Sequence, residues 1–324
     1  MPTSIVSSTP STALIGTAVP AEIFVLLEVP PPWDKPALLS EGVPESLRQA
    51  IKPWLDSPTK VRVHLIANEQ TATHTQRRIL IFQQEHRFSS SPGNATVGGR
   101  LSRQYTAWET QVPAPADMAP ALDSFFHHRS RGASSNLWHR SQQRHLMICT
   151  HASHNECCGA YGYPFYQAAI AQVQQLGLTE QVQPWQITHI GGHRFAPTLI
   201  DFPQGRYYGN LNEGSLQKLL QPQGDVSPLL ATYRGWSALP KPLQILETEL
   251  LHQHGWRWFA AAVAGRILSC DEAQKQHQVE LWFKLPNQPL KRCIGDIQNS
   301  RVVDYTVESQ HELGAQHWSE RKTG

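Results

Sequence analysis

The sequence lacks any apolar run of about 18 residues, the length that a membrane-spanning helix requires. Residues 1–6 have neither the basic stretch nor the long apolar stretch of a secretory leader. An excess of one charge is also missing, because 28 lysines and arginines stand against 26 aspartates and glutamates. This balance gives no indication of a nucleic-acid partner or a membrane surface. We therefore expect a cytoplasmic protein with no membrane and no nucleic-acid partner.

Familiar catalytic and nucleotide-binding motifs are missing as well. The chain has no Gly-x-Gly-x-x-Gly fingerprint, no phosphate-binding loop and no Ser-His-Asp signature. The segment 159–162, Gly-Ala-Tyr-Gly, lacks the nucleotide-binding spacing, and we interpret it as a turn that leads into a helix. There is no Cys-x-x-Cys motif, on which thiol-disulfide enzymes commonly build a reactive thiolate. We therefore expect no catalytic residues and favour a protein other than an enzyme.

Cysteine is scarce, but three of the five cysteines lie within ten residues, at Cys149, Cys157 and Cys158. In a reducing compartment, clustered cysteines are more often metal ligands or catalytic thiols than disulfides. Two histidines, His189 and His193, are separated by Ile-Gly-Gly. Each motif follows a strand-like apolar run, so the sequence predicts a set of metal ligands at the ends of two strands. The alternative is that the cysteines are buried and pack as small apolar residues.

Two thiolates and two imidazoles are a donor set that binds either zinc or a [2Fe-2S] cluster. The two glycines favour a tight loop over a helix, because glycine adopts backbone conformations closed to other residues. Adjacent side chains diverge, so only one of Cys157 and Cys158 can share a metal with Cys149, and spacing alone does not decide which. His151 and His154 are interpreted as surface residues or residues that surround the ligands.

The two halves of the chain show the same order of predicted elements. After a flexible segment at 1–14, apolar spacing predicts strands at 23–29, 61–67, 78–83 and 105–111, with helices at 44–55 and 117–127. The second half has strands at 145–150, 185–189, 198–202 and 206–208, with helices at 163–176 and 215–220. We therefore predict a mixed α/β protein of two β-α-β-β-α units, at 15–135 and 136–235, of which only the second holds ligands.

A small α/β appendage is predicted at 236–324. Its expected elements are a helix at 243–254 and strands at 279–285 and 302–308, whereas residues 256–268 fit either a strand or a helix. Cys270 and Cys293 lie far from the ligand motifs and from each other, and we interpret both as structural.

Four motifs together resemble the sucrase/ferredoxin-like family of thioredoxin-like ferredoxins. They are Cys-Thr-His at 149–151, Cys-Cys-Gly at 157–159, His-x-Gly-Gly-His-Arg-Phe-Ala at 189–196 and Pro-x-Gly-x-x-Tyr-Gly at 203–209. The likeness extends to residues 14–18, 32–33 and 233–235. The chain departs from the family at residues 11–13, where members often have a cysteine, and at Ala152 and Asn155, but neither departure removes an expected ligand.

The resemblance implies a thioredoxin-like fold and an iron-sulfur cofactor, a [2Fe-2S] cluster bound by two cysteines and two histidines. The implied ligands are Cys149, Cys158, His189 and His193, with Cys157 as the alternative to Cys158. The implied function is electron transfer as a ferredoxin, with protein redox partners that the sequence does not identify. Because a histidine ligand keeps an N–H on its second nitrogen, we expect proton-coupled one-electron chemistry. The alternatives are a thiol-disulfide or cluster-dependent reductase, and an interaction protein with structural zinc in the same ligands.

Overall fold

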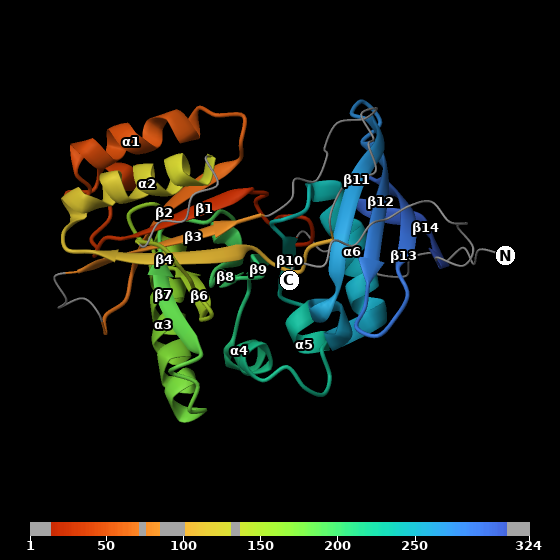
Figure 1. Ribbon diagram of the computed structural model, residues 1–324. Coiled ribbons are helices and arrows are strands. Elements are labelled where there is room, and N and C mark those ends of the chain that lie inside the picture. Colours follow the sequence, from red (N-terminus) through yellow and green to blue (C-terminus); the bar gives the residue numbers. More distant parts are fainter. Residues whose placement is uncertain (1–13, 71–75, 85–100, 131–136, 310–324) are drawn as a thin grey trace. The chain divides into compact units, whose positions relative to one another are not determined.

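The structure, a computed structural model, describes residues 14–70, 76–84, 101–130 and 137–309. The chain divides into two compact units (Figure 1). The larger unit comprises residues 18–85 and 104–238, and the smaller comprises residues 1–17, 86–103 and 239–324. The segment predicted to be flexible, 1–14, lies outside the described residues except for Leu14. The predicted boundaries at 135/136 and 235/236 stay predictions.

A ten-stranded mixed sheet forms the centre of the larger unit, in the order β10-β9-β8-β6-β7-β2-β1-β3-β4-β5. In each half the first strand is parallel to the second and antiparallel to the third, and the third is antiparallel to the fourth. The first half supplies β1 (Ile23–Glu28), β2 (Val61–Ala67), β3 (Arg77–Gln83) and β4 (Thr106–Val112). The second half supplies β6 (Arg144–Cys149), β7 (Val182–Ile187), β8 (Leu199–Phe202) and β9 (Arg206–Tyr208), while β5 (His139–Arg140) and β10 (Tyr233–Trp236) form the edges.

The two halves join where β2 pairs antiparallel with β7, so the strand order is palindromic about that junction. This arrangement confirms the predicted fold class, a mixed α/β protein with two tandem thioredoxin-like units. Backbone pairing at the junction continues past the end of β7: the Leu65 N–H donates to Thr188 Oγ1 (3.1 Å) and the Thr188 N–H donates to the Leu65 carbonyl (2.9 Å). The end of β7 is therefore anchored to the first half.

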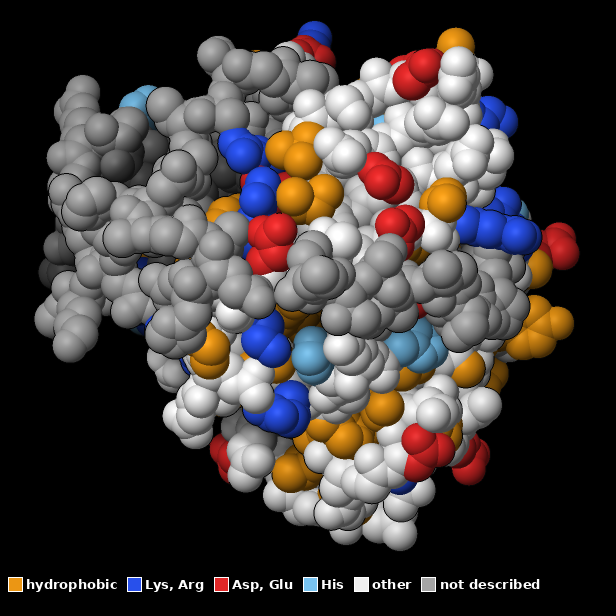
Figure 2. All heavy atoms as spheres, turned by 90° about the vertical axis from the view of Figure 1, so that its right-hand side faces the viewer, with side chains coloured by type: hydrophobic (Ala, Val, Ile, Leu, Met, Phe, Trp, Pro, Cys, Tyr) orange, Lys and Arg blue, Asp and Glu red, His pale blue; other side chains and the backbone are white. Residues whose placement is uncertain are grey.

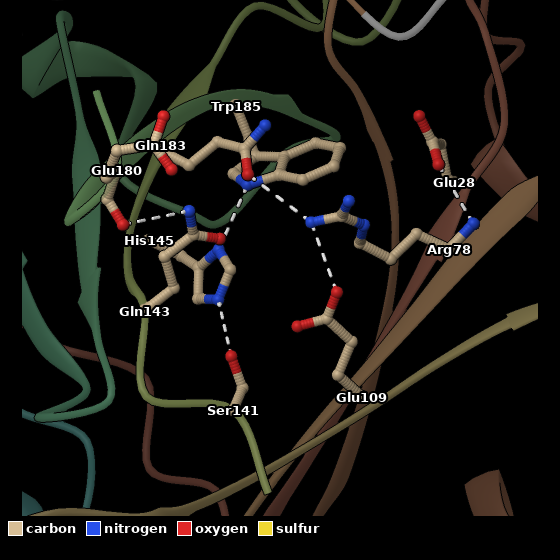
Figure 3. A network of polar contacts seen from close by, with 9 residues as sticks. All are labelled: Glu28, Arg78, Glu109, Ser141, Gln143, His145, Glu180, Gln183 and Trp185. Atoms are coloured by element: carbon tan, nitrogen blue, oxygen red, sulfur yellow. Dashed lines mark hydrogen bonds and ion pairs between the residues drawn. The ribbon is translucent and has the colours of Figure 1, made fainter. Parts of the chain in front are cut away.

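Polar contacts beside the sheet also connect the halves (Figure 3). Arg78 on β3 forms an ion pair with Glu109 (3.1 Å) and donates to Gln183 of the second half (3.3 Å). Its guanidinium lies 5.6 Å from the centre of the Trp185 ring, and the indole N–H of Trp185 donates to Nδ1 of buried His145 (3.1 Å). Because the indole needs an acceptor there, this network holds His145 in its neutral form.

The helices of the first half are α1 (Glu45–Leu55) and α2 (Met118–Ser130), which lie side by side (Figure 1). Buried Leu47 and Ile51 on α1 and Leu122 on α2 belong to the apolar core formed with β1, whose six residues are all buried. The second half has α3 (Glu156–Gln175), α4 (Glu213–Leu220) and the short α5 (Ser227–Leu230). Most predicted bounds agree to within a few residues, and the start of α3 is the exception considered below.

The smaller unit consists of helix α6 (Lys241–His254) and a four-stranded antiparallel sheet in the order β11-β12-β13-β14. The strands are β11 (Ala262–Asp271), β12 (Gln276–Lys284), β13 (Lys291–Gln298) and β14 (Arg301–Ser309). The segment that fitted either strand or helix is a 3-10 helix, η4 (Gly255–Ala260), followed by β11. Buried Glu280 on β12 receives hydrogen bonds from Arg266 and Arg292, each 2.6 Å long.

Within the described ranges, no helix is both long enough and apolar enough to cross a membrane. On the face shown in Figure 2, acidic and basic side chains of the described residues are interspersed, with hydrophobic side chains between them. This mixture agrees with the small net charge of +2.

Candidate metal centre

Cys149 is the last residue of β6 and is 1% exposed. The strand is held on both sides, because β6 pairs with β7 and with β8. The backbone N–H of Cys149 donates to the carbonyl of Thr198 (3.0 Å), just before β8 begins. These bonds fix the position from which the Cys149 thiol projects.

Helix α3 begins at Glu156, not at residue 163 as predicted, so the interpretation of 159–162 as a turn was wrong. Asn155 caps the helix by accepting the backbone N–H of Cys157 (3.0 Å). A Cβ atom at Gly162 would lie 1.9 Å from the Cys149 carbonyl oxygen, and one at Gly159 would lie 2.6 Å from the Ala152 Cβ. The glycines therefore allow the helix to approach the end of β6 closely. In the sequence, two glycines so near each other suggested a turn, but their role is to permit this packing.

The early start of α3 separates the two adjacent cysteines. Cys158 is 1% exposed and its Sγ lies 3.5 Å from His189 Nδ1, whereas Cys157 is only partly buried. Among the described residues, Cys149, Cys158 and His189 form a group whose potential ligand atoms all lie within 4.8 Å of one another. The other such group, Cys270, Glu272 and His277, lies in the smaller unit and is largely exposed.

The loop after β7 carries both predicted histidine ligands. Gly191 and Gly192 have φ angles of +85° and +77°, which strongly favour glycine and confirm the expected tight loop. His193 begins the 3-10 helix η3 (His193–Phe195), is exposed, and has its ring centre 6.0 Å from that of His189. The structure thus gathers three of the four predicted ligands and places His193 at the exposed edge of the group. The four-residue ligand set stays a prediction.

His151 and His154 surround this group. The His151 Nδ1 accepts the backbone N–H of His189 (3.3 Å), and Nε2 donates to the carbonyl of Asp34 (2.9 Å) in the loop after β1. Because both ring nitrogens are engaged, His151 holds the ligand loop and offers no free donor atom for a metal. The ring of His154 stacks on that of His189, with 3.8 Å between centres.

The first half contributes further contacts that sequence reasoning missed. The Ser153 hydroxyl donates to the carbonyl of Trp33, and Lys35 Nζ donates to the carbonyl of His154 (3.4 Å). The indole of Trp33 meets the His151 ring edge to face, with centres 5.9 Å apart. The loop after β1 therefore covers the loop that follows Cys149.

Arg234 on β10 is a further residue whose role the sequence did not reveal. Its side chain is buried, with the residue 1% exposed, and Nη1 donates to the Gly191 carbonyl (3.0 Å). The guanidinium lies 5.6 Å from the centre of the Phe195 ring and 5.4 Å from that of Tyr207. Only the Tyr-Arg-Gly match at 233–235 indicated that this position mattered, and it gave no role.

The two buried thiols influence each other. A hydrogen bond from the Cys158 thiol lowers the pKa of Cys149 well below its usual value, which outweighs the opposing effect of burial. The same bond is the largest cause that raises the pKa of Cys158. A thiolate at Cys149 is the form that binds a metal. Soft sulfur donors beside imidazole nitrogen fit zinc or an iron-sulfur cluster, so the donor set is chemically suited to either.

The match to a protein family agrees with the motifs. The sucrase/ferredoxin-like family model matches residues 14–235. Altered inheritance of mitochondria protein 32 from Meyerozyma guilliermondii is 33% identical over 79 residues, and the match covers 23% of this chain and only 28% of that protein. A thioredoxin-like [2Fe-2S] ferredoxin from Aquifex aeolicus is 14% identical, with a TM-score of 0.26 over 31% of this chain and 97% of that one. A cysteine-to-serine variant of that ferredoxin is 16% identical, with a TM-score of 0.24 over 28% and 96% of the two chains.

The family model covers more than half of the chain and includes every residue of the candidate metal centre. The chain belongs to the sucrase/ferredoxin-like family.

Proposed function

We propose that this protein is an electron carrier that holds a [2Fe-2S] cluster in Cys149, Cys158, His189 and His193. The observation that carries the proposal is the convergence of Cys149, Cys158 and His189 within 4.8 Å at the ends of β6 and β7 and the start of α3. Two thiolates and two imidazoles are a ligand set known for [2Fe-2S] clusters. When bound, such a cluster supplies a one-electron redox couple.

The chain divides the ligands into a buried side and an exposed side. Cys149 and Cys158 are each 1% exposed, so their thiolates are shielded from water and from oxidants. His193 is exposed, which makes its ring the natural face for exchange with a redox partner. The nitrogen of His193 that does not bind the metal can exchange its proton with water. We therefore expect proton uptake at His193 to accompany electron uptake.

The test is metal and sulfide analysis of protein purified without oxygen from its native host. We expect iron and acid-labile sulfide in the proportions of one [2Fe-2S] cluster per chain, with visible absorption typical of iron-sulfur proteins. Cys149→Ser, Cys158→Ser and His193→Ala should lose or strongly destabilise the cluster, while the matched variants Cys157→Ser and His154→Ala should retain it. Zinc in place of iron would refute the electron carrier and support a structural zinc site.

One observation favours a second candidate, a thiol-disulfide reductase. The Cys149 and Cys158 thiols lie in one group, and the lowered pKa of Cys149 is suited to nucleophilic attack on a disulfide. In that reaction the two thiols become a disulfide while the substrate disulfide takes up two electrons and two protons. Metal-free native protein with a reversible Cys149–Cys158 disulfide would support this candidate over the carrier.

A further inference from the structure

Arg234 brings a positive charge into the interior beside the loop that carries both histidine ligands. It comes from β10, outside the cysteine and histidine motifs, and is 1% exposed. Burial lowers the pKa of Arg234 to about 10, so the guanidinium stays charged at neutral pH. Burial of such a charge is costly unless the charge is paired and hydrogen-bonded, so its partners indicate what it does.

The guanidinium of Arg234 lies against the two glycines between the ligands. Its Nη1 donates to the Gly191 carbonyl (3.0 Å), and a Cβ atom at Gly192 would lie 2.6 Å from Nη2. The guanidinium is flanked by the rings of Phe195 and Tyr207, which restrict its orientation. The planar group therefore fits against the tight turn and leaves no space for a side chain at Gly192.

A fixed charge in this position also acts on redox chemistry. Interactions between charges are stronger in the interior than in water, because the surroundings are less polarisable. When an electron enters a centre held by His189 and His193, negative charge is added beside the loop that Arg234 contacts. A cation there stabilises the reduced state relative to the oxidised state.

We propose that Arg234 is a positioning residue that holds the Gly191–Gly192 turn and, through its charge, favours the reduced state of the metal centre. The charge effect rests on the proposed function, whereas the contact with the turn does not. The proposal gives the Tyr-Arg-Gly motif at 233–235 a role at the ligand loop, although Arg234 and Gly191 are 43 residues apart in the chain.

The protein contains a matched control in Arg206. This arginine is also 1% exposed, lies 5.7 Å from the centre of the Tyr233 ring and 5.1 Å from that of Trp236, and donates to the Tyr233 hydroxyl (2.5 Å). Arg206 is the first residue of β9, and its backbone lies opposite Asp201 of β8 and Trp236 of β10. This is the end of β8 that lies away from Thr198 and Cys149. Removal of the Arg206 charge should disturb packing to a similar degree without acting on the ligand loop.

The first measurement is a redox titration of the holoprotein, with dithionite as the electron donor, for Arg234→Met, Arg234→Lys and Arg206→Met. We expect Arg234→Met to lower the equilibrium constant for reduction at least tenfold, which is about 59 mV for a one-electron couple. Arg234→Lys, which keeps the charge, and Arg206→Met should change it by less. Equal shifts in Arg234→Met and Arg206→Met would overturn the charge effect.

The second measurement is amide hydrogen exchange over residues 189–193 in metal-free protein, which does not depend on the cluster. Faster exchange is expected in Arg234→Met and Arg234→Lys than in Arg206→Met, because lysine lacks the planar group that fits the turn. Equal exchange in all three would overturn the positioning role. If the wild type held no iron, the proposed function would fail while the exchange result still decided the contact. If Arg234→Met does not fold, Arg234→Gln, which also removes the charge and the guanidinium, replaces it in both measurements.

Discussion

Replacement of Gly162 by alanine tests the reasoning about how α3 and β6 create the metal centre. The new Cβ would lie 1.9 Å from the Cys149 carbonyl oxygen, 3.0 Å from its carbonyl carbon and 3.5 Å from the Thr150 Cα. All three atoms belong to the backbone, so no flexible side chain can move aside. Ordinary van der Waals contact begins near 3.4 Å, so the new Cβ and the Cys149 carbonyl oxygen would have to move apart by 3.4 minus 1.9, about 1.5 Å.

The cost follows from what resists that separation. Cys149 is fixed by β7 on one side and by Thr198 on the other, so β6 cannot shift alone. Overpacking of a buried contact costs about 1–3 kcal/mol, and the upper end applies when backbone must move. Alanine recovers about 1 kcal/mol through its better helix propensity. We expect a net loss of about 2 kcal/mol in the free energy of unfolding, together with a displacement of Cys158 from Cys149 that impairs metal binding.

Urea unfolding and metal content of Gly162→Ala give the two readouts. The control is Ala160→Gly, an exposed position in the same helix, which should lose about 1 kcal/mol from helix propensity and keep its metal. A Gly162→Ala protein that matched the wild type in stability and metal content would show that the helix does not need this close approach, and would refute the argument.

Three further changes have defined outcomes. His151→Ala removes the acceptor of the His189 N–H and should speed bleaching of the visible absorption by a chelator, whereas His252→Ala, an exposed control, should not. Glu280→Ala removes the carboxylate that Arg266 and Arg292 share in the smaller unit. The free energy of unfolding, measured in urea, should fall by about 3 kcal/mol, the low end for a broken buried ion pair, because both arginine side chains are 25% exposed. Iron content should not change. Burial lowers the pKa of His145 from 6.5 to about 3, so as pH drops the unfolded state binds a proton at this histidine before the folded state does. The free energy of unfolding should therefore fall between pH 6.5 and pH 3. Urea unfolding of His145→Gln should show a shallower fall over that range.

Residue spacing in the sequence correctly predicted those helices and strands whose buried residues follow a regular period. The apolar run of β1 and the helical spacing of α1 fixed those elements, because their buried residues follow the strand and helix periods. Prediction of the duplicated unit succeeded for the same reason. Strand β13 was missed and β11 was left undecided between strand and helix, because charged residues, such as the Lys291–Arg292 pair and Arg266, interrupt their apolar patterns. In the structure Arg266 and Arg292 are ion-paired to Glu280, a pairing that no local pattern reveals.

Three of the four predicted ligands lie together, whereas the residues that support the site were not predicted. Cys149 and His189 follow from motifs at strand ends, and the choice of Cys158 over Cys157 came from the family resemblance. The start of α3 was hidden by glycines that serve packing. His151 was interpreted as a surface or surrounding residue, and its acceptor at Asp34 lies 117 residues away in the chain. A hydrogen bond over that distance depends on how the two halves pack, which residue spacing does not encode.

That bond explains what the half without ligands contributes. Glu28 ends β1 as Cys149 ends β6, so the two loops that follow leave their strands from equivalent positions in the repeat. The loop after β1 carries no cysteine or histidine, yet its Trp33 and Asp34 carbonyls accept from Ser153 and His151. Without these acceptors the His151 N–H would be buried and unpaired, which costs about 1–3 kcal/mol. The His151 ring could then turn, and the His189 backbone N–H would lose its acceptor. The first half therefore stabilises the geometry of the ligands in the second half.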